Sequence, residues 1–238
     1  MDEPANNAPA TRRRPRWVLC DVNETLLDLQ PLKVSISRAL GGRSELVSLW
    51  FTTLLHYSLV ASALGRYRDF TALAGVALSA VAHGDGVEVS APQIAEALAP
   101  LAELPPHPDV IPALRRLNEA GIGLAALSNS SAQLLAAQLD HAALAPLFAA
   151  QFSVERVGRY KPHPEPYLAA VRSLNIAPGE ALLVAAHGWD IAGARAAGLR
   201  AIFVARPGKE LYRDGEPPEA IVHDFTELAD VLVNLPAA

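Results

Sequence analysis

The sequence contains one cysteine, few aromatic residues and no long uninterrupted apolar segment. Because Cys20 is the only thiol, an intramolecular disulfide is excluded, and its place in an apolar run argues against a reactive cysteine. No stretch approaches the ~18 apolar residues that a membrane span needs. A net charge of −5, with no basic face along the expected helices, argues against a nucleic-acid partner. We therefore expect a cytoplasmic protein that binds neither membrane nor nucleic acid.

What is abundant is apolar: hydrophobic residues make up 51% of the 238-residue chain, and alanine and leucine dominate. This composition predicts a globular protein with a sizeable core and many helices. Residues 1–15 are instead polar and rich in proline, alanine and arginine, which is typical of a disordered leader. Its arginine run 12–14 is similar to an export signal, but no apolar segment of about 7–15 residues follows before Asp21.

Strands and helices alternate in two separate parts of the chain, residues 16–28 and 107–238. The apolar run Trp17–Cys20 predicts a fully buried strand that ends at Asp21. We expect further strands over 122–127, 151–154, 181–185 and 200–205, and helices over 109–120, 131–140, 164–174, 190–197 and 224–235. This alternation predicts an α/β core domain, Rossmann-like, with a parallel sheet and helices on both faces.

Residues 29–106 interrupt the alternation and show only helical patterns. Apolar side chains recur at three- and four-residue spacing, and helices are expected over 31–40, 44–64, 69–83 and 90–103. Ser90 and Gln93 form a plausible capping box at the start of the last helix. The segment therefore predicts an all-helical cap domain inserted into the core, closed by the proline-rich segment 104–108.

Three of the expected strands end in polar residues: Asp21, the pair Ser128 and Asn129, and the segment 187–190. Since the carboxyl ends of parallel strands share one edge, these side chains should meet at the ligand edge of the sheet. Lys161, on a polar loop, would face Asp21 and Asp190 there and keep Asp21 ionised. Taken singly, each has an ordinary alternative, namely turn or helix capping for the polar residues and solvent exposure for the lysine.

The four segments together resemble the haloacid dehalogenase superfamily, and within it the type II L-2-haloacid dehalogenases, over nearly all of residues 16–206. The family has four motifs. They are an aspartate nucleophile followed by a threonine, a Ser-Asn pair, a Lys-Pro with a later tyrosine, and a Trp-Asp that opens a helix. In this sequence they are Asp21 and Thr25; Ser128 and Asn129; Lys161, Pro162 and Tyr167; and Trp189, Asp190 and Gly193-Ala194-Arg195. The resemblance implies a hydrolase.

Two positions separate this chain from the phosphatases of the same superfamily. Asn23 stands where phosphatases have the aspartate that protonates the leaving alkoxide, and Ala186 stands where they have a magnesium-binding aspartate. Halide needs neither acid nor metal to leave, so the resemblance implies a 2-haloacid dehalogenase without metal or cofactor. Such an enzyme would convert 2-haloacid and water into 2-hydroxyacid and halide, here through an ester on Asp21.

The resemblance also implies roles for the site residues. Lys161 would keep Asp21 ionised, Asp190 would help to activate water, and oxygen atoms would be positioned by Thr25, Ser128 and Asn129. The haloacid and the halide would be contacted by Asn23, Phe51, Leu55, Phe70, Tyr167, His187 and Trp189. A homodimer formed through segment 44–64 is possible, although that segment could equally be cap core.

The sequence departs from the type II pattern in the substrate pocket. Phe51 follows Trp50 where the family usually has an anion-binding arginine, and Ala185 and His187 replace a serine and an asparagine. His187 could activate water, and His56 and Arg66 could contact an anion or simply lie on the surface. Three functions remain open: a dehalogenase with shifted specificity, a hydrolase or phosphatase for another small substrate, and a non-catalytic binding protein. The retained trio Asp21, Lys161 and Asp190 disfavours the last, because burying charge is costly.

Overall fold

The computed structural model describes residues 13–237. Within them, six parallel strands form one sheet: β1 (Trp17–Cys20), β2 (Gly123–Ser128), β3 (Ala150–Ser153), β4 (Ala181–Ala185), β5 (Arg200–Val204) and β6 (Ala220–Val222). Their order across the sheet is β3-β2-β1-β4-β5-β6. This order places the topological switch point, where ligands bind in open α/β sheets, between β1 and β4.

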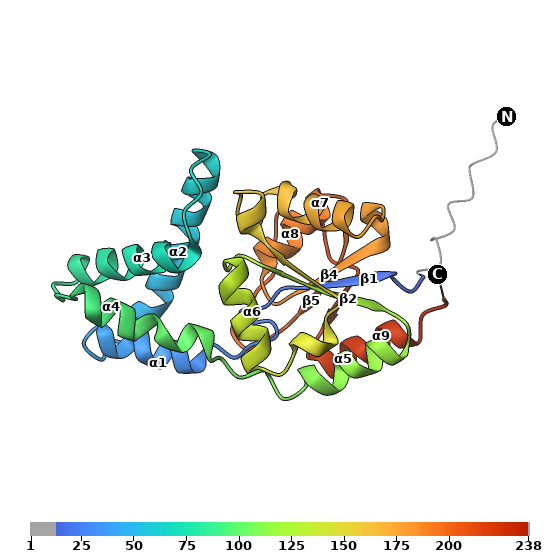
Figure 1. Cartoon of the computed structure of the whole chain (residues 1–238), viewed down its shortest axis with the longest axis horizontal. Coiled ribbons are helices and arrows are strands. Elements are labelled where there is room, and N and C mark those ends of the chain that lie inside the picture. The colour runs from blue at the N-terminus through green and yellow to red at the C-terminus, as the bar shows by residue number, and fades with distance from the viewer. Residues whose placement is uncertain (1–12, 238) are drawn as a thin grey trace.

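Helices cover both faces of the sheet (Figure 1). On one face lie α5 (Val110–Glu119), α6 (Ala132–His141) and α9 (Phe225–Val233), and on the other lie α7 (Pro164–Ser173) and α8 (Gly188–Ala196). Val18 and Cys20 pack into the core on the first face, whereas Leu19 packs into the core on the second. Strands buried on both faces explain why β1 is a continuous apolar run.

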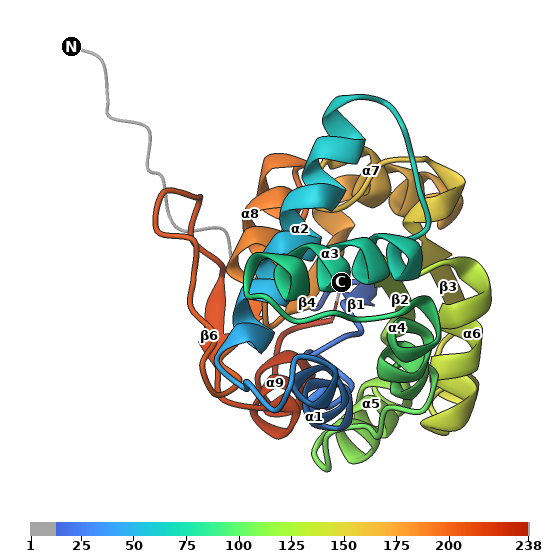
Figure 2. The ribbon, with the colours of Figure 1, turned by 90° about the vertical axis from the view of Figure 1, so that its left-hand side faces the viewer.

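A separate layer of helices caps the carboxyl edge of the sheet (Figure 2). It consists of α1 (Gln30–Ala39), α2 (Leu46–Ala63), α3 (Phe70–Gly84) and α4 (Ala91–Leu98), followed by a 3₁₀ turn over Ala99–Ala102. The expected helix 90–103 is thus shorter, since Pro100 falls in its last turns. The Gln93 side chain accepts from the Ser90 N–H at 2.9 Å. The α/β fold with an inserted helical cap is confirmed.

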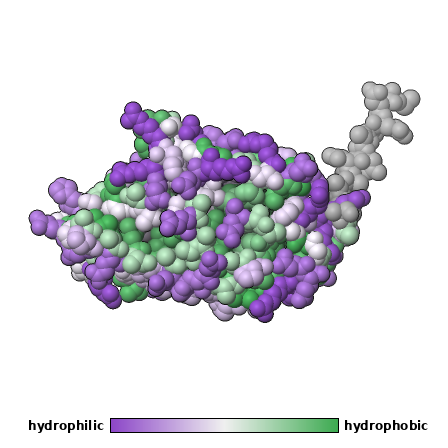
Figure 3. Space-filling view, in the orientation of Figure 1, coloured by the Kyte–Doolittle hydropathy of each residue, from purple (hydrophilic) through white to green (hydrophobic). Residues whose placement is uncertain are grey.

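We expected no stretch with the length and composition of a membrane span, and this expectation is wrong for one helix. Helix α2 has 18 residues with a mean hydropathy of 1.4, which is long and apolar enough to cross a bilayer. It packs here against α3, and its inward side chains, including Trp50, Leu54 and Ala61, are buried. Leu49, Val60 and Leu64 remain exposed. Over the face shown in Figure 3, hydrophobic and hydrophilic side chains are intermixed.

The ends of the described chain differ in part from the sequence expectations. Residues 1–12 of the expected leader lie outside the described part, while Arg14 donates its backbone N–H to Pro236 O at 2.8 Å. Strand β6 was not expected, because its three residues follow a proline-containing loop and Ile221 is half-exposed. Further short 3₁₀ turns span Ala145–Leu147, Val154–Arg156 and Pro178–Glu180.

Candidate active site

Asp21 leaves the end of β1 at the switch point and is held there by the turn that follows. Its backbone N–H donates to Val184 O on the neighbouring strand at 3.0 Å. The Thr25 hydroxyl donates to Asp21 Oδ2 at 2.6 Å, and Thr25 Oγ1 accepts from the Ala186 N–H at 2.9 Å. Arg206 donates to the Thr25 carbonyl at 3.1 Å. The turn therefore fixes one carboxylate oxygen of Asp21 against β4.

Lys161 lies between two carboxylates, as the strand-end argument expects. Its Nζ is 2.8 Å from Asp21 Oδ1 and 2.6 Å from Asp190 Oδ2, and it donates to Leu127 O at 3.0 Å. All three ammonium hydrogens thus have acceptors, which a fully buried lysine requires. The Asn129 side chain accepts from the Lys161 backbone N–H at 3.0 Å, so Asn129 orients the loop that carries the lysine.

The charges of this cluster keep the Asp21 carboxylate ionised. Burial by itself raises the pKa of Asp21, but the Lys161 ammonium and the hydrogen bond from His187 outweigh it, and the pKa lies well below its ordinary value. Burial lowers the pKa of Lys161, but the carboxylates of Asp190 and Asp21 raise it by more. The pKa therefore lies above its ordinary value, and Lys161 stays an ammonium. Asp21 is consequently an anion at neutral pH.

Asp190 lies behind Lys161 and does not line the cavity described below. Its Oδ2 accepts from Lys161, and its Oδ1 accepts from the Tyr167 hydroxyl at 2.5 Å. Burial and the Asp190 charge raise the pKa of Tyr167 well above its usual value, so Tyr167 stays a donor. Tyr167, expected to contact substrate, is instead placed against Asp190 and outside the cavity lining.

His187 and Glu24 extend the cluster on the other side of Asp21. His187 Nδ1 lies 3.1 Å from Asp21 Oδ2, and Nε2 lies 3.0 Å from Glu24 Oε2. Glu24 also pairs with Lys33 at 2.7 Å and with Lys209. Sequence reasoning missed Glu24, whose only signal was an acid inside the polar turn after Asp21. Its backbone adopts a positive φ of 64°, and its buried carboxylate lies against His187.

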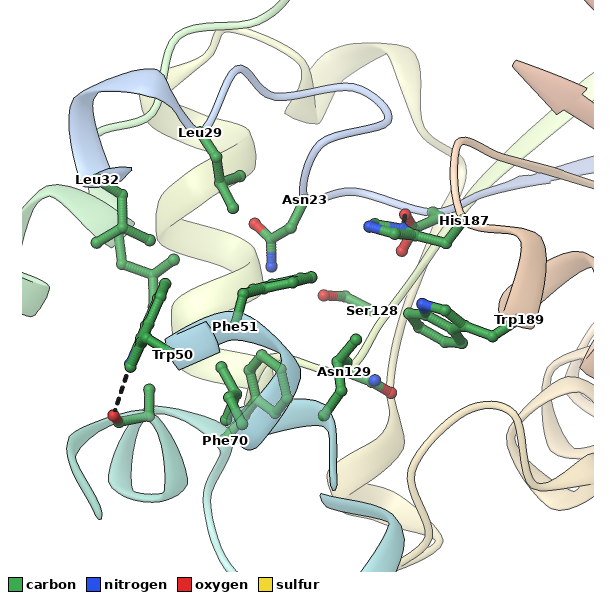
Figure 4. A pocket seen from close by; sticks show the side chains of 15 residues that line it. Asn23, Leu29, Leu32, Trp50, Phe51, Phe70, Ser128, Asn129, His187 and Trp189 are labelled. Carbon is green, nitrogen blue, oxygen red and sulfur yellow. Dashed lines mark hydrogen bonds and ion pairs between the residues drawn. The ribbon is translucent and has the colours of Figure 1, made fainter. Parts of the chain in front are cut away.

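A cavity of about 30 Å³ lies between the core and the cap (Figure 4). Its core wall is formed by Asp21, Asn23, Ser128, Asn129, His187 and Trp189, and its cap wall by Leu29, Leu32, Trp50, Phe51, Leu54, Leu55, Phe70, Ala74 and Leu101. The expected contact residues Asn23, Phe51, Leu55, Phe70, His187 and Trp189 therefore share this cavity. His56 and Arg66 are exposed and outside its lining.

The amide of Asn23 is held by residues that sequence reasoning missed. Gln138, fully buried on α6, donates to Asn23 Oδ1 at 3.0 Å, and Asn23 Nδ2 donates to Ser130 Oγ at 3.3 Å. The Ser130 N–H in turn donates to Ser128 Oγ at 3.1 Å. A buried glutamine in the middle of an otherwise apolar helix face was the available signal.

The side chains at the carboxyl edge of the sheet limit which other reactions it could support, such as metal-assisted or thiol chemistry. In the described range, 13–237, no group of three histidine, cysteine, aspartate or glutamate side chains could hold a metal ion. Ala186, at the position where phosphatases have a metal-binding aspartate, contributes only its backbone N–H. Burial, with the nearby Asp21 charge, raises the pKa of Cys20, so its thiol is no nucleophile. The arrangement can thus supply an anionic nucleophile and donors around it.

Comparison with known protein sequences identifies a family and several relatives. A family model of haloacid dehalogenase-like hydrolases matches residues 15–198. The (S)-2-haloacid dehalogenase of Xanthobacter autotrophicus is 32% identical over 81% of this chain and 76% of its own length. The (S)-2-haloacid dehalogenase H-109 of Pseudomonas putida is 31% identical over 91% of this chain and 97% of its own.

Solved structures agree with the sequence relatives. The L-2-haloacid dehalogenase of Xanthobacter autotrophicus with chloropropionic acid covalently bound superposes with a TM-score of 0.86 at 27% identity. The match covers 92% of this chain and 99% of that one, cap included. On the family model, the relatives and this shared fold, the chain belongs to the haloacid dehalogenase-like hydrolases.

Proposed function

We propose that this hydrolase releases halide from small (S)-2-haloalkanoic acids through an ester formed on Asp21. The observation that carries the proposal is a buried, ionised Asp21 on an apolar cavity, with an amide, Asn23, in place of a neighbouring acid. Halide leaves without protonation, whereas the alkoxide of a phosphate ester needs an acid. The names of the relatives support the same substrate class.

In the first step a carboxylate oxygen of Asp21 attacks C2, a carbon–oxygen bond forms, and the carbon–halogen bond breaks with its electron pair leaving on the halide. Asp21 Oδ2 is held by Thr25 and His187, whereas Oδ1 accepts only from Lys161. Oδ1 is therefore the less encumbered oxygen for attack. The cap excludes water from the cavity, so the carboxylate is poorly hydrated and its attack is favoured.

In the second step water hydrolyses the ester and regenerates Asp21. Attack at the Asp21 carbonyl carbon places negative charge on Oδ2, to which the Thr25 hydroxyl donates. Such preorganised donors stabilise the charge that develops in acyl transfer. The overall reaction takes up one water and releases the 2-hydroxyacid, halide and one proton.

The two walls of the cavity would divide substrate recognition. Ser128, Asn129 and Asn23 provide the polar groups for the substrate carboxylate on the core side. Phe51 and Leu55 provide an apolar surface for the halogen and C3 on the cap side. We expect short acids such as haloacetate or 2-halopropionate, because bulky side chains of the cap wall, including Phe51 and Leu55, line the cavity.

Location and assembly form part of the proposal. The buried free thiol of Cys20 supports a reducing, cytoplasmic location. Exposed apolar side chains on α2, including Leu49, Leu59 and Val60, support a homodimer through the cap. Light scattering across a concentration series tests the dimer, and a mass of one chain at every concentration would refute it.

The decisive assay measures halide release from (S)-2-chloropropionate and chloroacetate in the presence of EDTA, with Asp21→Asn as the matched variant. We expect release by the wild type and a loss of about 10⁴-fold or more in the variant, because the nucleophile is gone. Release that survives in Asp21→Asn would refute the ester route. Cleavage of a phosphate ester with added Mg²⁺, without any halide release, would assign the chain to the phosphatases.

A further inference from the structure

His187 lies between two carboxylates, and only one of them, Asp21, forms an ester in the proposed reaction. His187 Nδ1 faces Asp21 at 3.1 Å and Nε2 faces Glu24 at 3.0 Å. Phe51 and Trp189 lie against the ring, with centroid separations of 6.1 and 5.1 Å. The imidazole is therefore fixed in orientation and buried, and it lines the cavity together with Asp21.

The charged groups around this ring set its protonation. Asp21 and Glu24 both have depressed pKa values: burial raises them, but His187 and lysines outweigh burial. Two ionised acceptors require both ring nitrogens to donate, so the resting ring is an imidazolium. Burial lowers the pKa of His187, but hydrogen bonds to the two carboxylates raise it above its ordinary value. Lys33 and Lys209 contact Glu24 and partly offset its charge.

Ester formation changes this balance on one side only. When Asp21 is alkylated its negative charge disappears, while Glu24 keeps its charge and its contact with Nε2. The proton on Nδ1 then has no anion to hold it and is released to solvent. This is the one proton that the overall reaction liberates, and its loss leaves a lone pair on Nδ1 beside the ester carbonyl.

We infer that His187 is the general base for ester hydrolysis and that Glu24 is the positioning residue that holds its ring; the inference rests on the proposed dehalogenase function. Neutral His187 takes a proton from water as the oxygen bonds to the Asp21 carbonyl carbon. The ester bond to the alkyl oxygen then breaks, and the alkoxide takes that proton from Nδ1. Asp21, left as a carboxylic acid, returns its proton to His187, which restores the resting ion pair.

The nearest competing base is Asp190, and its contacts make it unsuitable. Both of its oxygens are occupied, one by Lys161 at 2.6 Å and one by Tyr167 at 2.5 Å, and it lies outside the cavity lining. A second possibility keeps His187 protonated, as a donor to the developing oxyanion. The two roles of His187 predict opposite dependence of hydrolysis on pH, which makes them separable.

The test is a single-turnover experiment with enzyme in excess over (S)-2-chloropropionate, between about pH 5 and 9. Halide reports the first step, and intact mass of the quenched protein reports the ester and its hydrolysis. We expect His187→Asn to keep the halide burst but to slow hydrolysis by about 10²–10⁴-fold, so that the ester accumulates. In the wild type, hydrolysis should rise with pH to a plateau.

Two further variants shift that pH profile in opposite directions. Glu24→Gln keeps the shape but removes the anion, so the midpoint should move to lower pH. Lys209→Met removes a cation that offsets Glu24, so the midpoint should move to higher pH. The control is Glu227→Gln, which removes the carboxylate from an exposed pair with His223 and should leave the profile unchanged.

The outcomes are distinct. No halide burst in the wild type would overturn the proposed function itself. A normal burst with wild-type profiles in both Glu24→Gln and Lys209→Met would overturn the inference while leaving the dehalogenase intact. Hydrolysis that falls as pH rises would assign His187 the oxyanion-donor role and also overturn it. Should Glu24→Gln not fold, as judged by circular dichroism, the shift in Lys209→Met decides.

Discussion

The two walls of the cavity differ sharply in how strongly their side chains depend on one another. On the core wall, Asp21 is joined by short contacts to Lys161, Thr25 and His187, and each of these has a further partner. On the cap wall, apolar side chains such as Leu29 and Leu54 make packing contacts. A change in the core should therefore alter chemistry and folding together, whereas a change in the cap should alter mainly which acid fits.

The largest expected effect comes from removing the buried cation. Lys161→Met would leave Asp21 and Asp190 facing each other without compensation, so one of them must take up a proton. We expect loss of halide release by at least about 10³-fold, and destabilisation by about 3–5 kcal/mol in urea unfolding. Arg116→Met, which breaks an exposed pair with Asp230, is the control and should cost less than about 1 kcal/mol. An active, stable Lys161→Met would contradict the coupled core wall.

A moderate effect is expected from the cap. Phe51→Ala enlarges the cavity by a ring, so the preference between chloroacetate and 2-chlorobutyrate, measured as the ratio of kcat/KM values, should shift toward the longer acid by about 10-fold or more. The ester should still form, since Phe51 is not among the hydrogen-bond or ion-pair partners of Asp21. Leu49→Ala, half-exposed on the same helix, should leave the ratio as it is. Loss of halide release from both acids in Phe51→Ala would break the division between the walls.

The smallest expected effect is on the free energy of unfolding at acid pH. An ordinary aspartate has a pKa near about 3.9, and the pKa of Asp21 lies below its ordinary value. A depressed folded pKa stabilises the fold above the unfolded pKa, and this contribution is lost as pH falls through the folded value. The difference in unfolding free energy between wild type and Asp21→Asn should thus shrink from pH 6 to pH 3. A difference that grows instead would mean that Asp21 is not held as an anion.

Much of the core was predictable because its signals are local. Strand β4 occurs at the expected residues. Asp21 and Ser128 lie at strand ends, and Asp190 lies in the first turn of α8 after β4, so a parallel sheet brings all three to one edge. The helical cap was predictable because its apolar spacing has no strand pattern. Strand β6 was missed, since three residues with one buried side chain carry no period.

Other features depend on contacts that no local pattern encodes. Glu24 meets His187 across 163 positions, and Gln138 meets Asn23 across 115. The direction of the Tyr167 side chain depends on how α7 packs against α8. The sequence could therefore indicate that Tyr167 lies near the site, but not that it faces Asp190 and not the substrate. Long-range pairing of polar groups is set by the assembled fold.

The most direct test of the central claim follows oxygen. A single turnover of (S)-2-chloropropionate with excess enzyme in H₂¹⁸O tells whether water attacks the substrate or the enzyme. If Asp21 forms the ester, its carboxylate is the source of the new hydroxyl oxygen. We predict unlabelled lactate and one ¹⁸O on the peptide that contains Asp21, both measured by mass spectrometry. Labelled lactate with an unlabelled Asp21 peptide would contradict the account.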